Sequence, residues 1–246
     1  MDLMSTDQAY RSNPFPLYTS LRESEPVAKG SINGMTGWLV TRYDLVRPLL
    51  TDPRLSSNPS NEGGQAGRGD ISGNAPDPDG PFAHQMVMMD APDHTRLRRL
   101  VTKGFTARRV ELLRTRVQEI ADELIDAMPP GGTDLTAAFA APLPLIVIME
   151  ILGVAESDRD AFVHWCKIVT DGVPETADQI PEAWAQLLTL FYATVGAKSA
   201  ANADTDLLSA LVALRDEGDR LTTNELVSIS VLINAGRTHD DRRPHQ

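Results

Sequence analysis

The chain has 246 residues, of which 41% are hydrophobic, and it carries a formal net charge of −11. This length allows a substantial core, and the ordinary hydrophobic fraction excludes wholesale disorder. The acidic balance argues against a nucleic-acid-binding protein, which would show a basic face. The polar start and the lack of an apolar run of about 18 residues lead us to expect a soluble, cytoplasmic protein without a membrane segment.

The first 50 residues predict a strand pair between two short helices, 14–23 and 43–50. The first helix is entered at Pro14, a residue favoured at helix starts. The strands, 26–28 and 37–41, are rich in branched and aromatic residues and form a hairpin in this interpretation. The turn formers between them are Gly30, Asn33 and Gly34.

Residues 56–82 are crowded with Gly, Ser, Asn, Pro and Asp. So long a stretch without regular structure is typical of a functional loop or a linker. Beyond it, apolar residues recur every three or four positions, which predicts a mainly helical chain. The helices are expected over 93–101, 106–128, 142–152, 157–170, 180–199, 206–215 and 222–235, and Thr222 with Glu225 forms a capping box for the last.

Side chains that bind metals are few and scattered. The single cysteine, Cys166, excludes an intramolecular disulfide, and the five histidines show no pair at the spacing of a zinc site. We therefore expect no metal site made from this chain's side chains alone.

The most informative segment runs from Met89 to Val110. On a helix, His94 and Arg98 lie four residues apart and share a face with Val101 and Phe105. Arginine and histidine donors suit a carboxylate or phosphate. The alternative is a solvated basic face neutralised by the chain's acids, and the residues alone leave both interpretations open.

The segment Asp90–Val101, followed by Gly104-Phe-Thr-Ala-Arg-Arg109, resembles the C-helix signature of bacterial, soluble (class I) cytochromes P450, with Ala91 in place of the usual proline. Further resemblance covers residues from about 10 to 236. The segments that carry it are Asn13–Tyr18, Trp38–Val46, Leu50–Ser57, Ile148–Arg159, Leu207–Leu211 and Leu221–Leu226. It implies a mainly α cytochrome P450 fold from helix A to the start of helix I, with a small N-terminal β element. In this interpretation residues 1–236 are the N-terminal part of one domain, cut within helix I, and about 56–88 is the B–C loop.

The resemblance also implies an activity. Members of the family are haem-thiolate monooxygenases that oxidise a small organic substrate with O2 and electrons from a ferredoxin and its reductase. It places the propionates of haem b on His94 and Arg98, and Ala235 and Gly236 at the start of the I-helix catalytic groove. The expected pocket residues are Met86, Val87, Met88, Met89 and Ile233. For the methionine-rich run, plain core packing is the alternative.

Two departures from the family pattern stand out. The axial cysteine and the family's Glu-x-x-Arg pair are missing, and Cys166 lies in a helical setting unlike a haem loop. We therefore expect propionate anchors without an iron ligand, and no monooxygenase activity from this chain alone. The alternatives are a truncated remnant or helical interaction module without haem, and a helical transcription regulator, which the acidic charge opposes.

The last ten residues, 237–246, form an aberrant charged tail in which the apolar periodicity stops at Gly236. Our hypothesis is a frameshift, because codons for His239–Gln246 can be chosen, within the degeneracy of the code, so that the frame displaced by one base encodes Thr-Thr-Thr-Ala-Ala-Leu-Thr, a suitable helix I continuation. The nucleotide sequence decides it, and an authentic short splice or a deliberate truncation is the alternative.

Overall fold

The structure, a computed structural model, describes residues 13–32, 35–58, 61, 80–171, 174–201, 206–214 and 218–235. These residues form two compact units, one ending at Ser56 and the other beginning at Ser57. The units are distinguished by the residue contacts within each of them. The single domain expected over 1–236 stays a prediction. Gly236 and the charged tail 237–246 lie outside the described residues, as does most of the loop predicted over 56–82.

The first unit is the predicted hairpin with its two helices. Its elements are α2 (Phe15–Ser24), β1 (Val27–Ile32), β2 (Met35–Val40) and α3 (Tyr43–Leu49). The strands are antiparallel, from Val27 opposite Val40 to Ile32 opposite Met35. Leu21 of α2 and Ala28 of β1 form a small buried cluster with Leu17 and Leu39 beside them.

One detail of the hairpin prediction is wrong. The sequence predicts Gly30 in the turn, but it lies inside β1 and faces Gly37 of β2. The strands extend further than their side-chain pattern predicts, because main-chain hydrogen bonds extend the ladder through residues that have little side chain to pack.

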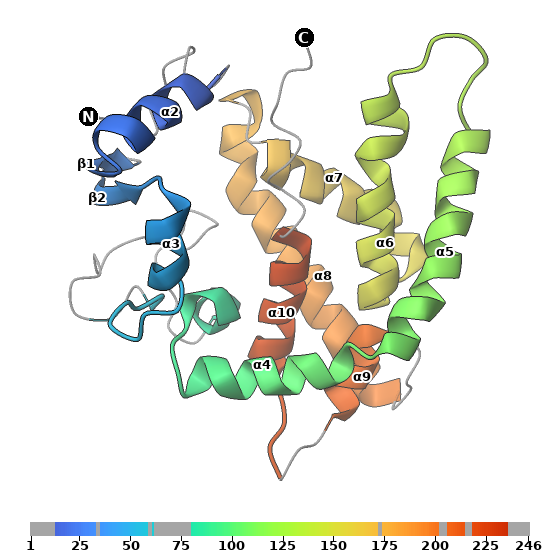
Figure 1. Cartoon of the computed structure of the whole chain (residues 1–246). Helices are drawn as coiled ribbons and strands as arrows, with labels where there is room; N and C mark the ends of the chain where they lie inside the picture. Colours follow the sequence, from blue (N-terminus) through green and yellow to red (C-terminus); the bar gives the residue numbers. More distant parts are fainter. Residues whose placement is uncertain are drawn as a thin grey trace. The chain divides into compact units, whose positions relative to one another are not determined.

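The second unit is helical (Figure 1). Its helices are α4 (Asp93–Gly104), α5 (Ala107–Asp126), α6 (Pro142–Leu152), α7 (Arg159–Asp171), α8 (Ile180–Ala201), α9 (Leu207–Ala213) and α10 (Thr223–Ala235). The short turns η1 (Pro81–His84) and η2 (Met86–Met88) precede α4, η3 (Thr136–Ala140) precedes α6, η4 (Glu156–Asp158) precedes α7 and η5 (Pro174–Gln179) precedes α8. The mainly α fold and each helix expected from apolar periodicity are confirmed.

Helix α10 forms the centre of this unit. It packs against α6, α8, α9 and η1, and Figure 1 shows α4 crossing near its first turn. Each residue from Glu225 to Val231 is buried, as expected of a helix that is surrounded by others. The main core cluster includes Leu97, Leu100, Leu152, Phe162, Leu187, Phe191, Leu211 and Val227.

Helix ends follow local chemistry. The Thr106 hydroxyl accepts a hydrogen bond from the Arg109 N–H and begins α5, while Asp206 caps α9 in a capping box with Ser209. Helix α6 ends at Gly153, whose φ of 61° is left-handed. A Cβ at this glycine would collide with the side chains of Asp206 and Lys198, which form an ion pair.

Among the helices that the structure describes, none combines the length and the apolar character needed to cross a bilayer.

Candidate functional site

Helix α4 carries the candidate site, and its buried stripe determines which side chains face outward. Leu97, Leu100, Val101 and Gly104 are buried on one side of the helix. Gly104 packs so closely on α9 that an added Cβ would collide with the Leu211 side chain. Any larger residue at this position would therefore force the Leu211 side chain to move.

His94 and Arg98 lie on one flank of this stripe. His94 is half-buried, Arg98 is exposed, and the side chain of neither has a hydrogen bond or ion pair among the described residues. Both line an open groove of about 480 Å³, whose other lining residues are Thr95, Arg99, Thr102 and Lys103. The groove is therefore lined by cations and threonines, and no acid is among its lining residues.

The expected apolar neighbours of this pair are confirmed only in part. Val101 is buried, as predicted, but Phe105 is 48% exposed. Helix α4 ends at Gly104, so Phe105 has left the helical face on which the spacing placed it.

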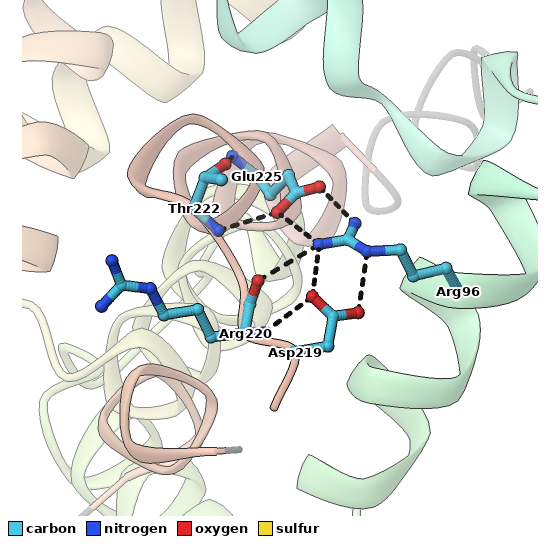
Figure 2. Close-up of polar contacts among 5 residues, drawn as sticks. All are labelled: Arg96, Asp219, Arg220, Thr222 and Glu225. Atoms are coloured by element: carbon cyan, nitrogen blue, oxygen red, sulfur yellow. Dashed lines mark hydrogen bonds and ion pairs between the residues drawn. The ribbon is translucent and has the colours of Figure 1, made fainter. Parts of the chain in front are cut away.

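Arg96 lies on the opposite flank of α4 and is fully engaged (Figure 2). Its Nε and Nη2 donate to the two oxygens of Asp219 at 2.8 and 3.1 Å. Its Nη1 donates to Glu225 Oε1 at 2.6 Å, and Nη2 also reaches the Arg220 carbonyl at 3.1 Å. This guanidinium joins α4 to the residues that lead into α10.

The cluster shifts the protonation equilibria of its members. Hydrogen bonds to Glu225 and Asp219 raise the pKa of Arg96 above its usual range. Burial alone would raise the pKa of Glu225, but hydrogen bonds from Arg96 and from the Thr222 N–H outweigh it and leave that pKa lowered. The hydrogen bond from Arg96 lowers the pKa of Asp219 as well. Both carboxylates are therefore charged at neutral pH, and Arg96 offsets one of their two negative charges.

Sequence reasoning missed this cluster, although the predicted capping box is confirmed. Thr222 N–H donates to Glu225 Oε2 at 2.7 Å, and Glu225 N–H donates to Thr222 Oγ1 at 3.2 Å. No sequence signal links Arg96 to Asp219 and Glu225, which lie 123 and 129 residues away.

The expected pocket residues divide into two groups. Met86, Met89 and Ile233 are half-buried and pack against the main core cluster. Val87 and Met88 are exposed, at 55% and 38%. The structure thus brings three of the five to the core, and their role in binding a substrate stays a prediction.

Cys166 is fully buried inside the helical core. Its Sγ lies 3.2 Å from Asn234 Oδ1, so the thiol of α7 donates to an amide of α10, next to Ala235. Ala235 is half-buried at the end of α10. Gly236, which is expected to form the start of the I-helix catalytic segment together with Ala235, lies outside the described residues. Among the residues described, His, Cys, Asp and Glu form no cluster of three or more suited to a metal ion.

Comparisons with known proteins cover nearly the whole chain. No protein-family model matches it. Cytochrome P450 107B1 of Saccharopolyspora erythraea is 39% identical over 240 residues, which are 94% of this chain and 57% of that protein. The cytochrome P450 monooxygenase PikC of Streptomyces venezuelae is 40% identical over 244 residues, covering 96% of this chain and 55% of PikC. The chain thus spans little more than half the length of these relatives.

Comparison with solved structures also gives cytochromes P450. The chain superposes on the Bacillus subtilis cytochrome P450 PksS with a TM-score of 0.81 and 30% identity, over 95% of this chain and 57% of PksS. The P450 monooxygenase TamI matches with a TM-score of 0.77 and 33% identity, over 94% of this chain and 54% of TamI. In sequence and in fold, the chain therefore belongs to the bacterial cytochrome P450 family, of which it carries the N-terminal part.

Proposed function

We propose that the chain is part of a haem-thiolate monooxygenase, in which His94 and Arg98 bind the propionates of haem b. One observation carries this proposal. His94 and Arg98 share a helix face, and neither side chain has a partner among the described residues, although the chain as a whole has a net charge of −11. Elsewhere on the same helix, Arg96 is matched with two acids.

The residues present fit such a group. A haem propionate is a carboxylate, and arginine presents two parallel N–H donors to a carboxylate, while a histidine ring adds a further N–H. The groove beside the pair is lined by cations and threonines, so the electrostatic field there favours an anion. Hydrogen bonds to charged groups stabilise by roughly 1.5–3 kcal/mol each. Two such contacts would contribute substantially to cofactor affinity.

Haem with an axial cysteine thiolate supplies the activation of O2 and the oxidation of the substrate. This chain's residues would hold the propionates through α4. Met86, Val87, Met88, Met89 and Ile233 would line the wall for a small organic substrate, and Ala235 and Gly236 are the proposed start of the catalytic segment. The name of the relative PikC, a monooxygenase, supports this class of reaction.

We also propose that electrons come from a ferredoxin and its reductase. Apart from Arg96, which binds two carboxylates, residues 93–110 carry five arginines and lysines but a single acid, Asp93, within an acidic chain. Such a local cationic surface favours docking of an acidic protein. A cytoplasmic location accords with this proposal, because the chain's single cysteine, Cys166, cannot form an intramolecular disulfide and so suits a reducing compartment.

Cys166 cannot act as the axial ligand. It is fully buried, it lies within α7, and its thiol donates to Asn234 of α10. A cysteine that binds iron must be deprotonated, and its sulfur must face the cofactor. We therefore propose that this chain alone does not catalyse oxygenation.

Absorption spectroscopy tests both parts of the proposal. The purified chain is titrated with haemin, reduced, and exposed to carbon monoxide. We expect binding of haemin without the Soret band that a thiolate ligand produces. A thiolate-type band from this chain would contradict the assignment of Cys166, and failure to bind haemin at all would contradict the role of His94 and Arg98.

One observation favours a second candidate, a helical interaction module without haem. Helix α5 exposes the apolar side chains of Val110, Leu112 and Ile125, each more than half exposed. Exposed apolar surface favours association. Sedimentation velocity of the haem-free chain tests this: concentration-dependent assembly supports the second candidate, and a monomer that binds haemin supports the first.

A further inference from the structure

We propose that Arg96 is a positioning residue for His94 and Arg98: it fixes the rotation of α4 about its own axis and so directs both side chains toward the haem propionates. This inference rests on the proposed function and deepens it. Arg96 itself would touch neither the cofactor nor the substrate.

The placement of Arg96 round the helix is the first argument. Successive residues of an α-helix are about 100° apart, so Arg96 and Arg98 lie about 160° apart, on opposite flanks of the stripe formed by Leu97 and Leu100. A rotation of α4 that pulls Arg96 from its partners therefore moves His94 and Arg98 on the other side by the same angle.

The buried stripe determines which face of α4 turns inward, but it opposes a small rotation of the helix less sharply than a directional contact does. Contacts between aliphatic side chains have no preferred direction, whereas a guanidinium that binds a carboxylate through two N–H groups has a defined one. Arg96 binds both oxygens of Asp219 in this way and binds Glu225 in addition. The Glu225 side chain is 9% exposed, whereas the side chains of Arg96 and Asp219 are 31% and 30% exposed, so water competes less for the contact with Glu225 than for the contact with Asp219.

The partners of Arg96 are themselves held in place. Glu225 accepts from the Thr222 N–H at 2.7 Å as part of the capping box, and Asp219 accepts from the Arg220 N–H at 2.8 Å (Figure 2). The Glu225 carboxylate is therefore tied to the first turn of α10, and the Asp219 carboxylate to the main chain of the segment that leads into it. Because Glu225 belongs to the first turn of α10, its contact with Arg96 ties the rotation of α4 to the helix that carries Ala235.

A small rotation of α4 is enough to separate Arg98 from a propionate. A rotation of about 20° moves a side-chain atom some 6 Å from the helix axis by about 2 Å. Hydrogen bonds span only about 0.5 Å in donor–acceptor distance, so such a movement separates Arg98 from a bound carboxylate. Loss of the directional contacts of Arg96 would thus weaken the part of the haemin affinity that depends on the propionates and leave the rest unchanged.

The test compares haemin with its dimethyl ester, in which the propionate charges are removed. Each ligand is titrated into the full chain and into Arg96→Lys, which keeps the charge but loses the guanidinium fork. Arg114→Lys is the matched control, because Arg114 forms an exposed pair with Glu111 on α5. We expect the wild-type chain to prefer the diacid, and Arg96→Lys to lower that preference at least about tenfold with the ester affinity unchanged. Arg114→Lys should alter neither.

A second variant guards against misfolding of the first. Asp219→Asn keeps Arg96 but weakens its bidentate partner, and it should reduce the preference for the diacid in the same direction. If either variant weakens the binding of both ligands equally, Arg96 has only a structural role and the inference is wrong. An unchanged preference in both variants overturns it as well. If the wild-type chain shows no preference, the proposed function fails first, and that result is seen without any variant.

Discussion

Replacing Glu225 by glutamine perturbs the junction of α4 and α10 with the smallest change of shape. Glu225 accepts hydrogen bonds from Arg96 Nη1 at 2.6 Å and from the Thr222 N–H at 2.7 Å. In Glu225→Gln the amide NH2 must face one of these donors, so one buried contact is lost together with the charge. A hydrogen bond to a charged group contributes roughly 1.5–3 kcal/mol, and we expect the free energy of unfolding to fall by about 2–3 kcal/mol.

The pH dependence provides a second readout. The folded-state pKa of Glu225 is lowered, so its charged form stabilises the fold above the pKa of the unfolded chain. That contribution is lost as the pH falls from the ordinary value of about 4.3 through the lower folded-state pKa. The wild-type chain should therefore approach the stability of Glu225→Gln at acidic pH, while the difference is constant near neutrality.

The assay is equilibrium unfolding in urea at a series of pH values. Glu119→Gln on α5 is the control, because Glu119 makes an exposed pair with Arg116, and such pairs contribute about 0–1 kcal/mol. Equal losses from the two substitutions would refute the reasoning. So would a difference between wild type and Glu225→Gln that stays constant down to acidic pH.

Three further predictions concern the core, a helix end and the cysteine. Phe162→Ala removes a fully buried ring that packs edge-on against Phe191 and should cost about 3–5 kcal/mol in urea unfolding; a loss below about 1 kcal/mol would contradict its place in the core. Gly153→Ala should lower the thermal midpoint, because its φ of 61° disfavours a side chain and the Cβ meets Asp206 and Lys198, whereas Gly132→Ala, which has open space, should not. Cys166→Ala should leave the absorption spectrum of the haemin complex unchanged, and a shifted Soret band would show that the thiol binds iron.

The helices were predictable because the residues that start, form and stop each helix lie close together in the sequence. In α5, apolar residues recur at helical spacing, Thr106 supplies the cap, and the Pro-Gly run after Met128 stops the helix. The strand pair was predictable for the same reason, although Gly30 shows that main-chain pairing can extend through a turn-forming residue. By contrast, the π turn over Thr136–Ala140 has no signal in its sequence.

The candidate site was predictable only where its residues lie close in the sequence. His94 and Arg98 are four apart, so their shared face follows from helix geometry. Arg96 could not be distinguished from Arg98 or Arg99 in the same basic run, because its role depends on carboxylates more than 120 residues away. The same limit applies to Cys166, whose partner Asn234 lies 68 residues further along the chain.

The most direct test of the account is the haemin affinity of the chain with both donors removed. His94→Leu combined with Arg98→Met leaves the buried stripe of α4 and the Arg96 cluster intact, and Arg108→Met serves as the control for the loss of a nearby surface charge. The account predicts at least about a tenfold weaker binding of haemin by the double variant, from the loss of charge-assisted hydrogen bonds, and unchanged binding by the control. Equal affinities for haemin in the wild-type chain and the double variant would contradict it.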